Sequence, residues 1–176
     1  GSLNFIFSSY DGSEPFASIV RKAQVAGYTE PDPRLDLSGT DVARKILILA
    51  RESGYESELA DVERIGFLPE SCLTGSVDDF FAELENNEEY FRKLFCGARK
   101  NGKTIRFVAS FDSGALRAGS QNIDLSHDFA GLSGTDNAIA FYTDRYRDRP
   151  LVIKGAGAGP EVTAAGVFAD MMRAAG

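Results

Sequence analysis

The segment from Lys103 to Asp124 reads Lys-Thr-Ile-Arg-Phe-Val-Ala-Ser-Phe-Asp-Ser-Gly-Ala-Leu-Arg-Ala-Gly-Ser-Gln-Asn-Ile-Asp. From Lys103 the spacing of apolar residues changes from helical to alternating, which predicts a β-strand over Thr104–Phe111. Asp112-Ser113-Gly114 is a turn signal, and Ala115–Asp124 is predicted to be the second strand of a hairpin. The segment therefore divides the chain into a helical first part and a second part rich in strands.

Upstream of this hairpin, apolar residues recur at helical spacing between capping residues. Leu3–Tyr10 is predicted to be a short buried helix, with a strand as the alternative because Phe and Ile favour both at this length. Further helices are predicted over Phe16–Ala26, with Gly27 as a left-handed cap, and over Thr40–Ser53. Another helix is predicted to begin at Ser76–Asp79 and to continue through Leu84, and the next to follow Asn86-Asn87 and to end near Asn101-Gly102. In the Thr40–Ser53 helix we expect the core-facing residues to be Val42, Ile46, Leu49 and Ala50.

Strands are expected mainly downstream of the hairpin, over Asn137–Tyr146 and Leu151–Lys154, with one short upstream strand over Val62–Phe67. A final helix is predicted from Glu161 to Arg173. Helices followed by a run of strands indicate an α+β fold, with a mixed, largely antiparallel sheet covered by helices on one face.

Composition narrows the classes of function. The 176 residues suffice for one domain with a substantial core, and a net charge of −7 with dispersed basic residues argues against a nucleic-acid partner. The longest apolar run, Ile46–Ala50, is too short to span a bilayer, so no membrane partner is expected. No signal peptide is visible, and a cytoplasmic location is the default expectation.

Cysteine and histidine offer little chemistry. Cys72 and Cys96 have no metal-binding spacing, so no metal site is expected. Free thiols in a reducing cytosol are favoured over a disulfide, which is the alternative. His127 is expected in a surface loop.

Residues that suggest chemistry are concentrated in Gly27–Lys45, which reads Gly-Tyr-Thr-Glu-Pro-Asp-Pro-Arg-Leu-Asp-Leu-Ser-Gly-Thr-Asp-Val-Ala-Arg-Lys. We call residues 27–39 the acidic loop. Its prolines restrict the backbone around Glu30 and Asp32, and Asp36 follows before a helix that Ser38 is predicted to cap. On that helix Asp41 and Lys45 share one face.

This layout places one ammonium group opposite several carboxylates, which suits a small zwitterionic ligand. The alternative is a surface Asp41–Lys45 ion pair contributing about 0.3 kcal/mol, and spacing alone favours that interpretation.

A second motif, Gly155-Ala156-Gly157-Ala158-Gly159, lies between a predicted strand and the final helix. We call residues 155–159 the glycine-rich motif. Such a turn can bring backbone N–H groups close to a nucleotide. However, it is not the G-x-G-x-x-G fingerprint of dinucleotide-binding domains. A tight connection with steric demands is therefore as well supported as a ligand contact.

The residues Gly27 to Pro33, together with Asp36, Gly39, Asp41 and Lys45, resemble homoserine dehydrogenase. The resemblance is closest to the dehydrogenase half of bifunctional aspartokinase–homoserine dehydrogenase. It continues through Leu3–Ile6, Ile46–Glu52, Asn137–Tyr142, Gly155–Gly159 and Val162–Asp170, and it is weaker between about Glu70 and Leu132. Leu35 stands where the bifunctional relatives usually carry a further acidic residue.

The resemblance implies the reduction of L-aspartate 4-semialdehyde to L-homoserine with NADPH or NADH, in threonine and methionine biosynthesis. By motif position it implies that Glu30, Asp36 and Asp41 bind the substrate amino acid. It further implies that Lys45 donates a proton to the aldehyde oxygen. Gly27 and Gly159 would contact the nicotinamide cofactor through their backbone.

The resemblance also implies an organisation. Residues 1–154 would be a substrate-binding and dimerisation domain that forms a homodimer. Residues 155–176 would be a loop and a C-terminal helix that pack on the family's nucleotide-binding domain. Because that domain is not in this sequence, we expect a fragment that is inactive alone, and the NADH or NADPH preference stays open. The alternative function is a non-catalytic dimerisation or assembly module.

Overall fold

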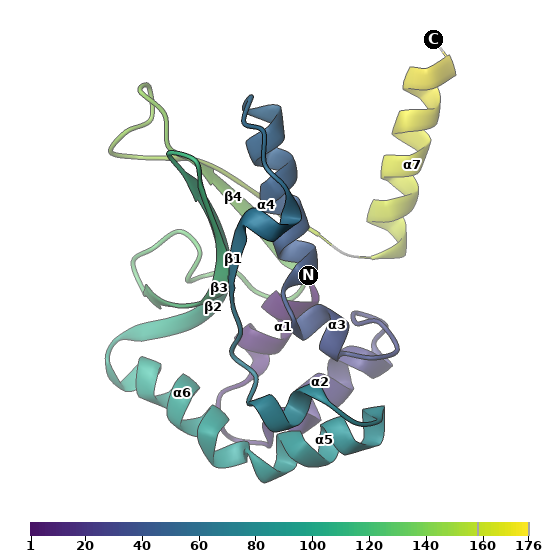
Figure 1. Cartoon of the computed structure of the whole chain (residues 1–176), viewed down its shortest axis with the longest axis vertical. Helices are drawn as coiled ribbons and strands as arrows, with labels where there is room; N and C mark the ends of the chain where they lie inside the picture. The colour runs from purple at the N-terminus through teal and green to yellow at the C-terminus, as the bar shows by residue number, and fades with distance from the viewer. Residues whose placement is uncertain (158, 176) are drawn as a thin grey trace.

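The computed structural model describes residues 1–157 and 159–175 (Figure 1). Within these ranges, a largely helical first part, interrupted by one short strand, is followed by four strands and a final helix. The helices are α1 (Ser2–Ser9), α2 (Phe16–Val25), α3 (Arg34–Leu37), α4 (Thr40–Glu52), α5 (Val77–Asn86), α6 (Glu88–Lys100) and α7 (Pro160–Ala175). The strands are β1 (Val62–Ile65), β2 (Lys103–Asp112), β3 (Ala115–Asp124), β4 (Asp136–Phe141) and β5 (Leu151–Ala156). Single 3₁₀ turns cover Leu59–Asp61 and Glu70–Leu73.

The first sheet has the strand order β1-β3-β2. Strands β2 and β3 form the predicted antiparallel hairpin, paired from Lys103↔Asp124 to Asp112↔Ala115. The two residues of its turn, Ser113 and Gly114, have φ of 49° and 89°, the positive values of a type I′ turn that matches the twist of the strands. Strand β1 adds to β3 in parallel.

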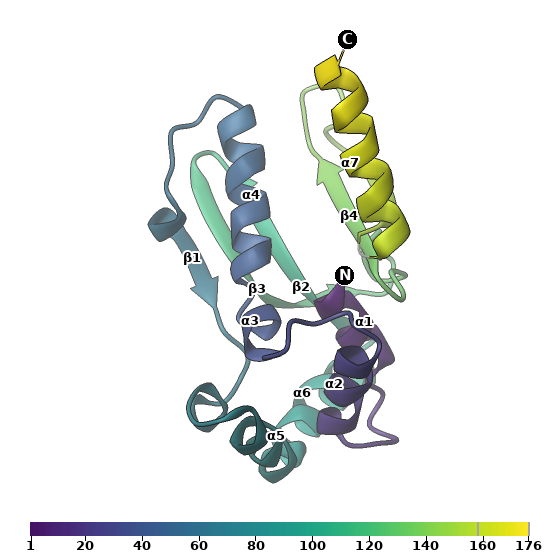
Figure 2. The same cartoon turned by 90° about the vertical axis from the view of Figure 1, so that its right-hand side faces the viewer.

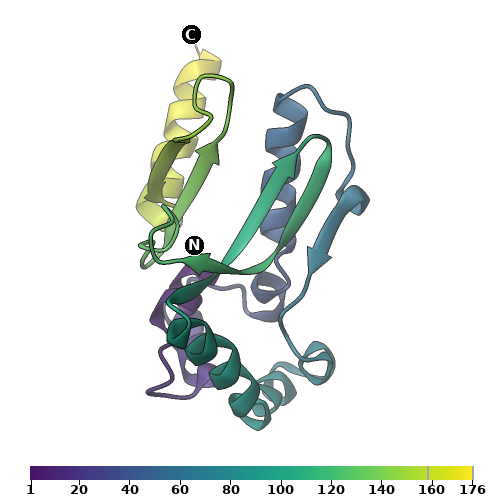
Figure 3. The same ribbon diagram turned by 90° about the vertical axis from the view of Figure 1, so that its left-hand side faces the viewer.

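The second sheet is the antiparallel pair β4–β5. Figure 3 shows the two sheets as separate ribbons, with α4 behind the first and α7 behind the second. The predicted α+β class is therefore confirmed, with mixed and antiparallel pairing and helices on one face. The expected single sheet is divided in two, since no ladder joins β2 or β3 to β4 in the described part of the chain.

The main core is aromatic and lies among α1, α2, α5, α6 and the first part of β2. The rings of Phe16 and Phe91 stack with their centroids 4.2 Å apart, and Phe7 contacts Phe67 and Phe95 edge to face. Burying each such ring contributes about 1.5–3 kcal/mol. This core packs α1 against α2, α6 and β2, so α1 is a helix and the alternative of a strand is wrong.

A smaller core lies between α4 and the three-stranded sheet. It contains Ala43, Leu47 and Ala50 of α4, and the half-buried Phe107 touches both cores. The predicted inward face of α4 is confirmed at Ala50, and Val42 and Ile46 pack half-buried against the two cores. The prediction missed Ala43 and Leu47, and Leu49 is only half-buried. Two alanines on the buried stripe leave room for the helix to lie close to the strands.

The end of α2 agrees with the sequence prediction, and the end of β4 does not. Gly27 ends α2 with φ of +72°, which confirms the left-handed cap. Strand β4 ends at Phe141 instead of Tyr146, because Tyr142–Arg149 forms an exposed loop rather than pairing with β5.

Both cysteines are free, with Cys72 buried and Cys96 half-buried. No helix in the described ranges is long and apolar enough to cross a membrane.

Candidate functional site

The first turns of α4 carry the candidate catalytic pair. Lys45 Nζ lies 2.7 Å from Asp41 Oδ2, and their side chains are 53% and 66% exposed. An ion pair this exposed contributes well under about 1 kcal/mol to stability. Both groups are, however, accessible to a ligand.

Gly39, and not Ser38, is the N-cap of α4. Its φ is +70°, and a Cβ added there would lie 2.1 Å from the Phe107 ring. The predicted Ser38 cap is therefore wrong: the ring of Phe107 requires glycine at the cap. Ser38 lies one residue before the cap. Its Oγ accepts the Thr40 N–H at 3.2 Å and donates to the Leu35 carbonyl.

Asp36 ties the acidic loop to the first helix. Its Oδ2 accepts the backbone N–H of Glu30 at 2.8 Å, and its Oδ1 accepts the hydroxyl of Ser2 at 2.9 Å. Both carboxylate oxygens are thus engaged within the protein. The side chain of Glu30 is exposed and accepts no hydrogen bond from any residue that the structure describes.

Arg34 fastens the same loop on its other side. Its guanidinium pairs with Asp32, with Nη2 and Oδ2 2.7 Å apart, and donates to the Gly75 carbonyl at 2.8 Å. The Arg34 guanidinium lowers the pKa of the Asp32 carboxyl below its ordinary value. Asp32 is therefore a structural member of the loop.

The Gly1 nitrogen links the start of α1 to the second sheet. It donates to Asn137 Oδ1 of β4 at 2.8 Å. The charges of Lys45, Asp41 and Asp36 all act on this nitrogen, so the three groups lie near the start of α1. Figure 2 shows the N-terminus beside α3 and the base of α4. The structure thus gathers Asp36, Asp41 and Lys45 around the start of α1, with Glu30 tied to them through Asp36.

The two glycines expected to face a cofactor have open surroundings. Gly27 and Gly159 have φ of +72° and +133°, and nothing lies within 4 Å of a Cβ added at either. Gly157 is different, because such an atom would lie 2.1 Å from Asn137 Nδ2. Ala158 of the glycine-rich motif lies outside the described residues.

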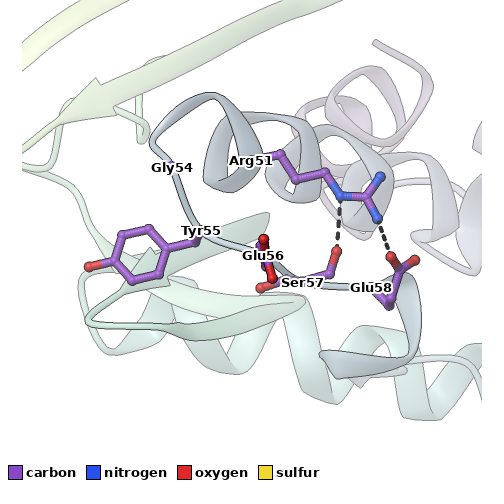
Figure 4. Close-up of a pocket in the computed structure, with 6 residues that line it drawn as sticks. All are labelled: Arg51, Gly54, Tyr55, Glu56, Ser57 and Glu58. Carbon is purple, nitrogen blue, oxygen red and sulfur yellow. Dashed lines mark hydrogen bonds and ion pairs between the residues drawn. The ribbon is translucent and has the colours of Figure 1, made fainter.

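A shallow pocket lies at the opposite end of α4 from Lys45 (Figure 4). Arg51 donates to the Ser57 carbonyl at 2.9 Å and pairs with Glu58, also at 2.9 Å. The Tyr55 ring packs on Phe111. Arg51 and Glu58 already neutralise each other, and none of the predicted site residues lines the pocket.

Sequence patterns did not identify three residues that hold the candidate site in place: Ser2, Arg34 and Asn137. Arg34 carried a usable signal, since it lies two positions from Asp32 within a proline-restricted loop. Ser2 and Asn137 carried none, because they contact residues 34 and 136 positions away.

Comparison with known proteins places the chain among characterised relatives. A family model described as homoserine dehydrogenase matches residues 1–172. A maize protein named bifunctional aspartokinase/homoserine dehydrogenase 2, chloroplastic, is 45% identical over 99% of this chain and 19% of its own length. A homoserine dehydrogenase of Emericella nidulans is 40% identical over 98% of this chain and 50% of its own length.

A crystal structure of Staphylococcus aureus homoserine dehydrogenase has a similar fold, with a TM-score of 0.69 and 25% identity over 99% of this chain and 41% of that one. The chain therefore spans between about a fifth and a half of the length of the curated relatives described here.

Proposed function

This chain belongs to the homoserine dehydrogenase family, and we propose that it forms the substrate side of an NAD(P)-dependent homoserine dehydrogenase site. The reaction in the longer enzyme is the reduction of L-aspartate 4-semialdehyde to L-homoserine. The observation that supports this most is the accessible Lys45–Asp41 pair, with Nζ and Oδ2 2.7 Å apart, beside a loop that Asp36 holds in place.

Substrate binding rests on the carboxylates of Glu30 and Asp41. Both are exposed, and either can accept hydrogen bonds from an α-ammonium group. Asp36 contributes by fixing the Glu30 backbone, because its two oxygens already accept protein hydrogen bonds. The acidic loop is thereby ordered before a ligand arrives, which reduces the entropic cost of binding.

Proton transfer rests on Lys45. When bound, NAD(P)H supplies the hydride that reduces the carbonyl carbon. The Lys45 ammonium donates a proton to the aldehyde oxygen, so that an alcohol forms and the amine left on Lys45 is reprotonated from solvent. Asp41 orients the ammonium group through the ion pair.

The glycines fit the approach of a flat ring to the backbone. Gly27 and Gly159 leave open space above their Cα atoms, and their positive φ values favour glycine. They would hold the nicotinamide end only, so we propose that the 176-residue chain alone binds the cofactor weakly and does not turn over. The choice of NADP or NAD would be made by residues of the nucleotide-binding domain.

The division into residues 1–154 and 155–176 remains part of this proposal. Every residue of α7 is exposed, including the apolar Val167, Phe168 and Met171. Such a surface is consistent with packing against a nucleotide-binding domain. The proposed cytoplasmic location rests on the sequence, and the maize relative is named as chloroplastic.

A second candidate function, a dimerisation module, is favoured by one face of β4–β5. Ile139 pairs with Ile153 and Phe141 with Leu151, and all four are 36–56% exposed. We propose that this face forms a homodimer. Sedimentation of the wild-type chain and of Ile153→Lys checks it: the wild type should dimerise and the variant should not. A wild-type monomer at high concentration contradicts the proposal.

The catalytic proposal is tested by Lys45→Ala in the full-length enzyme, with Lys93→Ala as its matched control. Lys93 forms the same kind of i,i+4 pair with Glu89 on α6, at 2.8 Å and fully on the surface. Each variant should change the free energy of unfolding by only about 0.5 kcal/mol. Lys45→Ala should lower kcat by about 10²-fold or more, and Lys93→Ala should leave it unchanged. Equal kcat values for the two variants contradict a role for Lys45 in proton transfer.

A further inference from the structure

The side chain of Asn137 lies directly across the backbone of Gly157. A Cβ added to Gly157 would lie 2.1 Å from Asn137 Nδ2 and 2.3 Å from its Cγ. The φ of Gly157 is not positive, so an alanine could adopt the same backbone conformation. A Cβ at this position would therefore meet the Asn137 side chain, and an alanine here would displace that side chain or the backbone of residue 157.

The backbone here continues the β4–β5 ladder. Asn137 is paired with Gly155 and Asp136 with Ala156, and the Gly157 N–H then donates to the Thr135 carbonyl at 3.0 Å. The glycine-rich motif thus leaves β5 along β4, and Asn137 determines how closely Gly157 can approach it.

The other end of the Asn137 amide reaches the substrate side. Its Oδ1 accepts a hydrogen bond from the Gly1 nitrogen at 2.8 Å. The next residue, Ser2, donates to Asp36, which holds the backbone of Glu30. These contacts connect Gly157 to the acidic loop through the start of α1, although the two segments are more than a hundred positions apart in the sequence.

The position of β4 is itself fixed by the segment that precedes it, residues 125–135. Arg106 of β2 donates to the carbonyls of Phe129, Ala130 and Leu132. Asn4 of α1 donates to the carbonyls of Ser133 and Gly134 at 3.2 and 3.1 Å. Because this connection is tied to both α1 and β2, β4 cannot readily shift to absorb a change at Asn137.

We propose that Asn137 is a positioning residue that sets the place of the Gly157 backbone relative to the acidic loop. This inference rests on the proposed function, in which the glycine-rich motif faces the cofactor and the acidic loop faces the substrate. Asn137 acts through Gly157 and touches neither reactant. A change in the Asn137–Gly157 contact should therefore alter cofactor binding more than substrate binding.

Kinetics of the full-length enzyme give the first test, with Gly157→Ala, Asn137→Ala, their double variant and the control Gly131→Ala. Gly131 has no positive φ, and nothing lies within 4 Å of an added Cβ. In the direction of homoserine oxidation, Gly157→Ala should raise KM for NAD(P)⁺ about tenfold and change KM for homoserine less than about twofold. Gly131→Ala should match the wild type.

The double variant should behave like Asn137→Ala alone, because the clash at residue 157 needs the Asn137 side chain. If Gly157→Ala raises KM for the cofactor as much in the Asn137→Ala background as in the wild type, the proposal is overturned. A Gly157→Ala enzyme with the same kinetics as Gly131→Ala also overturns it.

Amide hydrogen exchange on the 176-residue chain separates this inference from the proposed function. Asn137→Ala should speed exchange of the Gly157 N–H by about tenfold or more, and Gly131→Ala should leave it unchanged. Unchanged exchange in Asn137→Ala overturns the positioning role. A full-length wild type that does not oxidise homoserine instead overturns the proposed function, while the exchange result still decides whether Asn137 holds Gly157.

Discussion

The Oδ2 atom of Asp36 lies 2.8 Å from the backbone nitrogen of Glu30. This bond closes the acidic loop on itself across two prolines and directs the Glu30 side chain from a fixed backbone. The Asp36 carboxylate, which could otherwise bind a ligand, therefore orders the backbone at Glu30.

Replacing Asp36 by Ala should loosen the loop. The substitution removes both carboxylate oxygens, so the Glu30 N–H and the Ser2 hydroxyl lose their acceptors. We expect a loss of about 1–3 kcal/mol in the free energy of unfolding. KM for homoserine in the full-length enzyme should rise more than kcat falls. Ser2→Ala removes only the Oδ1 bond and is the control; equal effects of the two variants on KM would contradict the importance of the Glu30 bond.

Gly39 should tolerate substitution much less well than Gly54. Both have positive φ, +70° and +88°, and they flank the same helix. At Gly54 nothing lies within 4 Å of an added Cβ, so Gly54→Ala should cost only the backbone conformation, about 1–2 kcal/mol. Gly39→Ala adds a collision with the Phe107 ring and should cost at least about 1 kcal/mol more. Urea unfolding of both variants measures the difference, and equal midpoints would show that Phe107 does not restrict this position.

Arg106 should be essential for the connection to β4. It is 7% exposed and donates to the Phe129, Ala130 and Leu132 carbonyls as well as to Thr104 and Ile105. Arg106→Leu leaves these acceptors without their donor, at about 1–3 kcal/mol for each one that stays buried. Arg106→Lys keeps the charge but lacks the planar fork, so it should recover only part of the loss. Full recovery with Lys, measured by thermal unfolding, would show that charge matters and hydrogen-bond geometry does not.

The Asp32–Arg34 pair should make stability depend on pH in the acidic range. Arg34 lowers the pKa of Asp32 in the folded chain below the ordinary 3.8. The pair therefore stabilises the fold above about pH 4 and loses its contribution as the pH falls through the folded pKa. Because Asp32 is partly exposed, the contribution is at most about 1 kcal/mol. Wild type and Asp32→Asn should differ in urea midpoint at pH 7, and the difference should shrink as the pH falls through the lowered pKa of Asp32. A difference that does not shrink on acidification contradicts this origin.

Local patterns predicted most elements because their signals are local. The alternation over Thr104–Phe111 and the turn at Ser113-Gly114 predicted the hairpin, and Gly27 predicted the end of α2. Predictions that depended on a partner were less accurate. Ser38 was displaced from the cap by the Phe107 ring, and the buried face of α4 was decided by the sheet beneath it.

For the site, the sequence alone determined the chemical inventory: the prolines that stiffen the acidic loop, its carboxylates, and the spacing that places Asp41 and Lys45 on one helical face. Only the tertiary structure decided which of these groups meet. Asp36 turns inward to Glu30 and Ser2, and Asn137 joins the start of α1 to Gly157. The physical reason is that helical and strand periods constrain only near neighbours along the chain. Contacts across 34 and 136 positions exist because the aromatic core fixes α1 between α3 and β4.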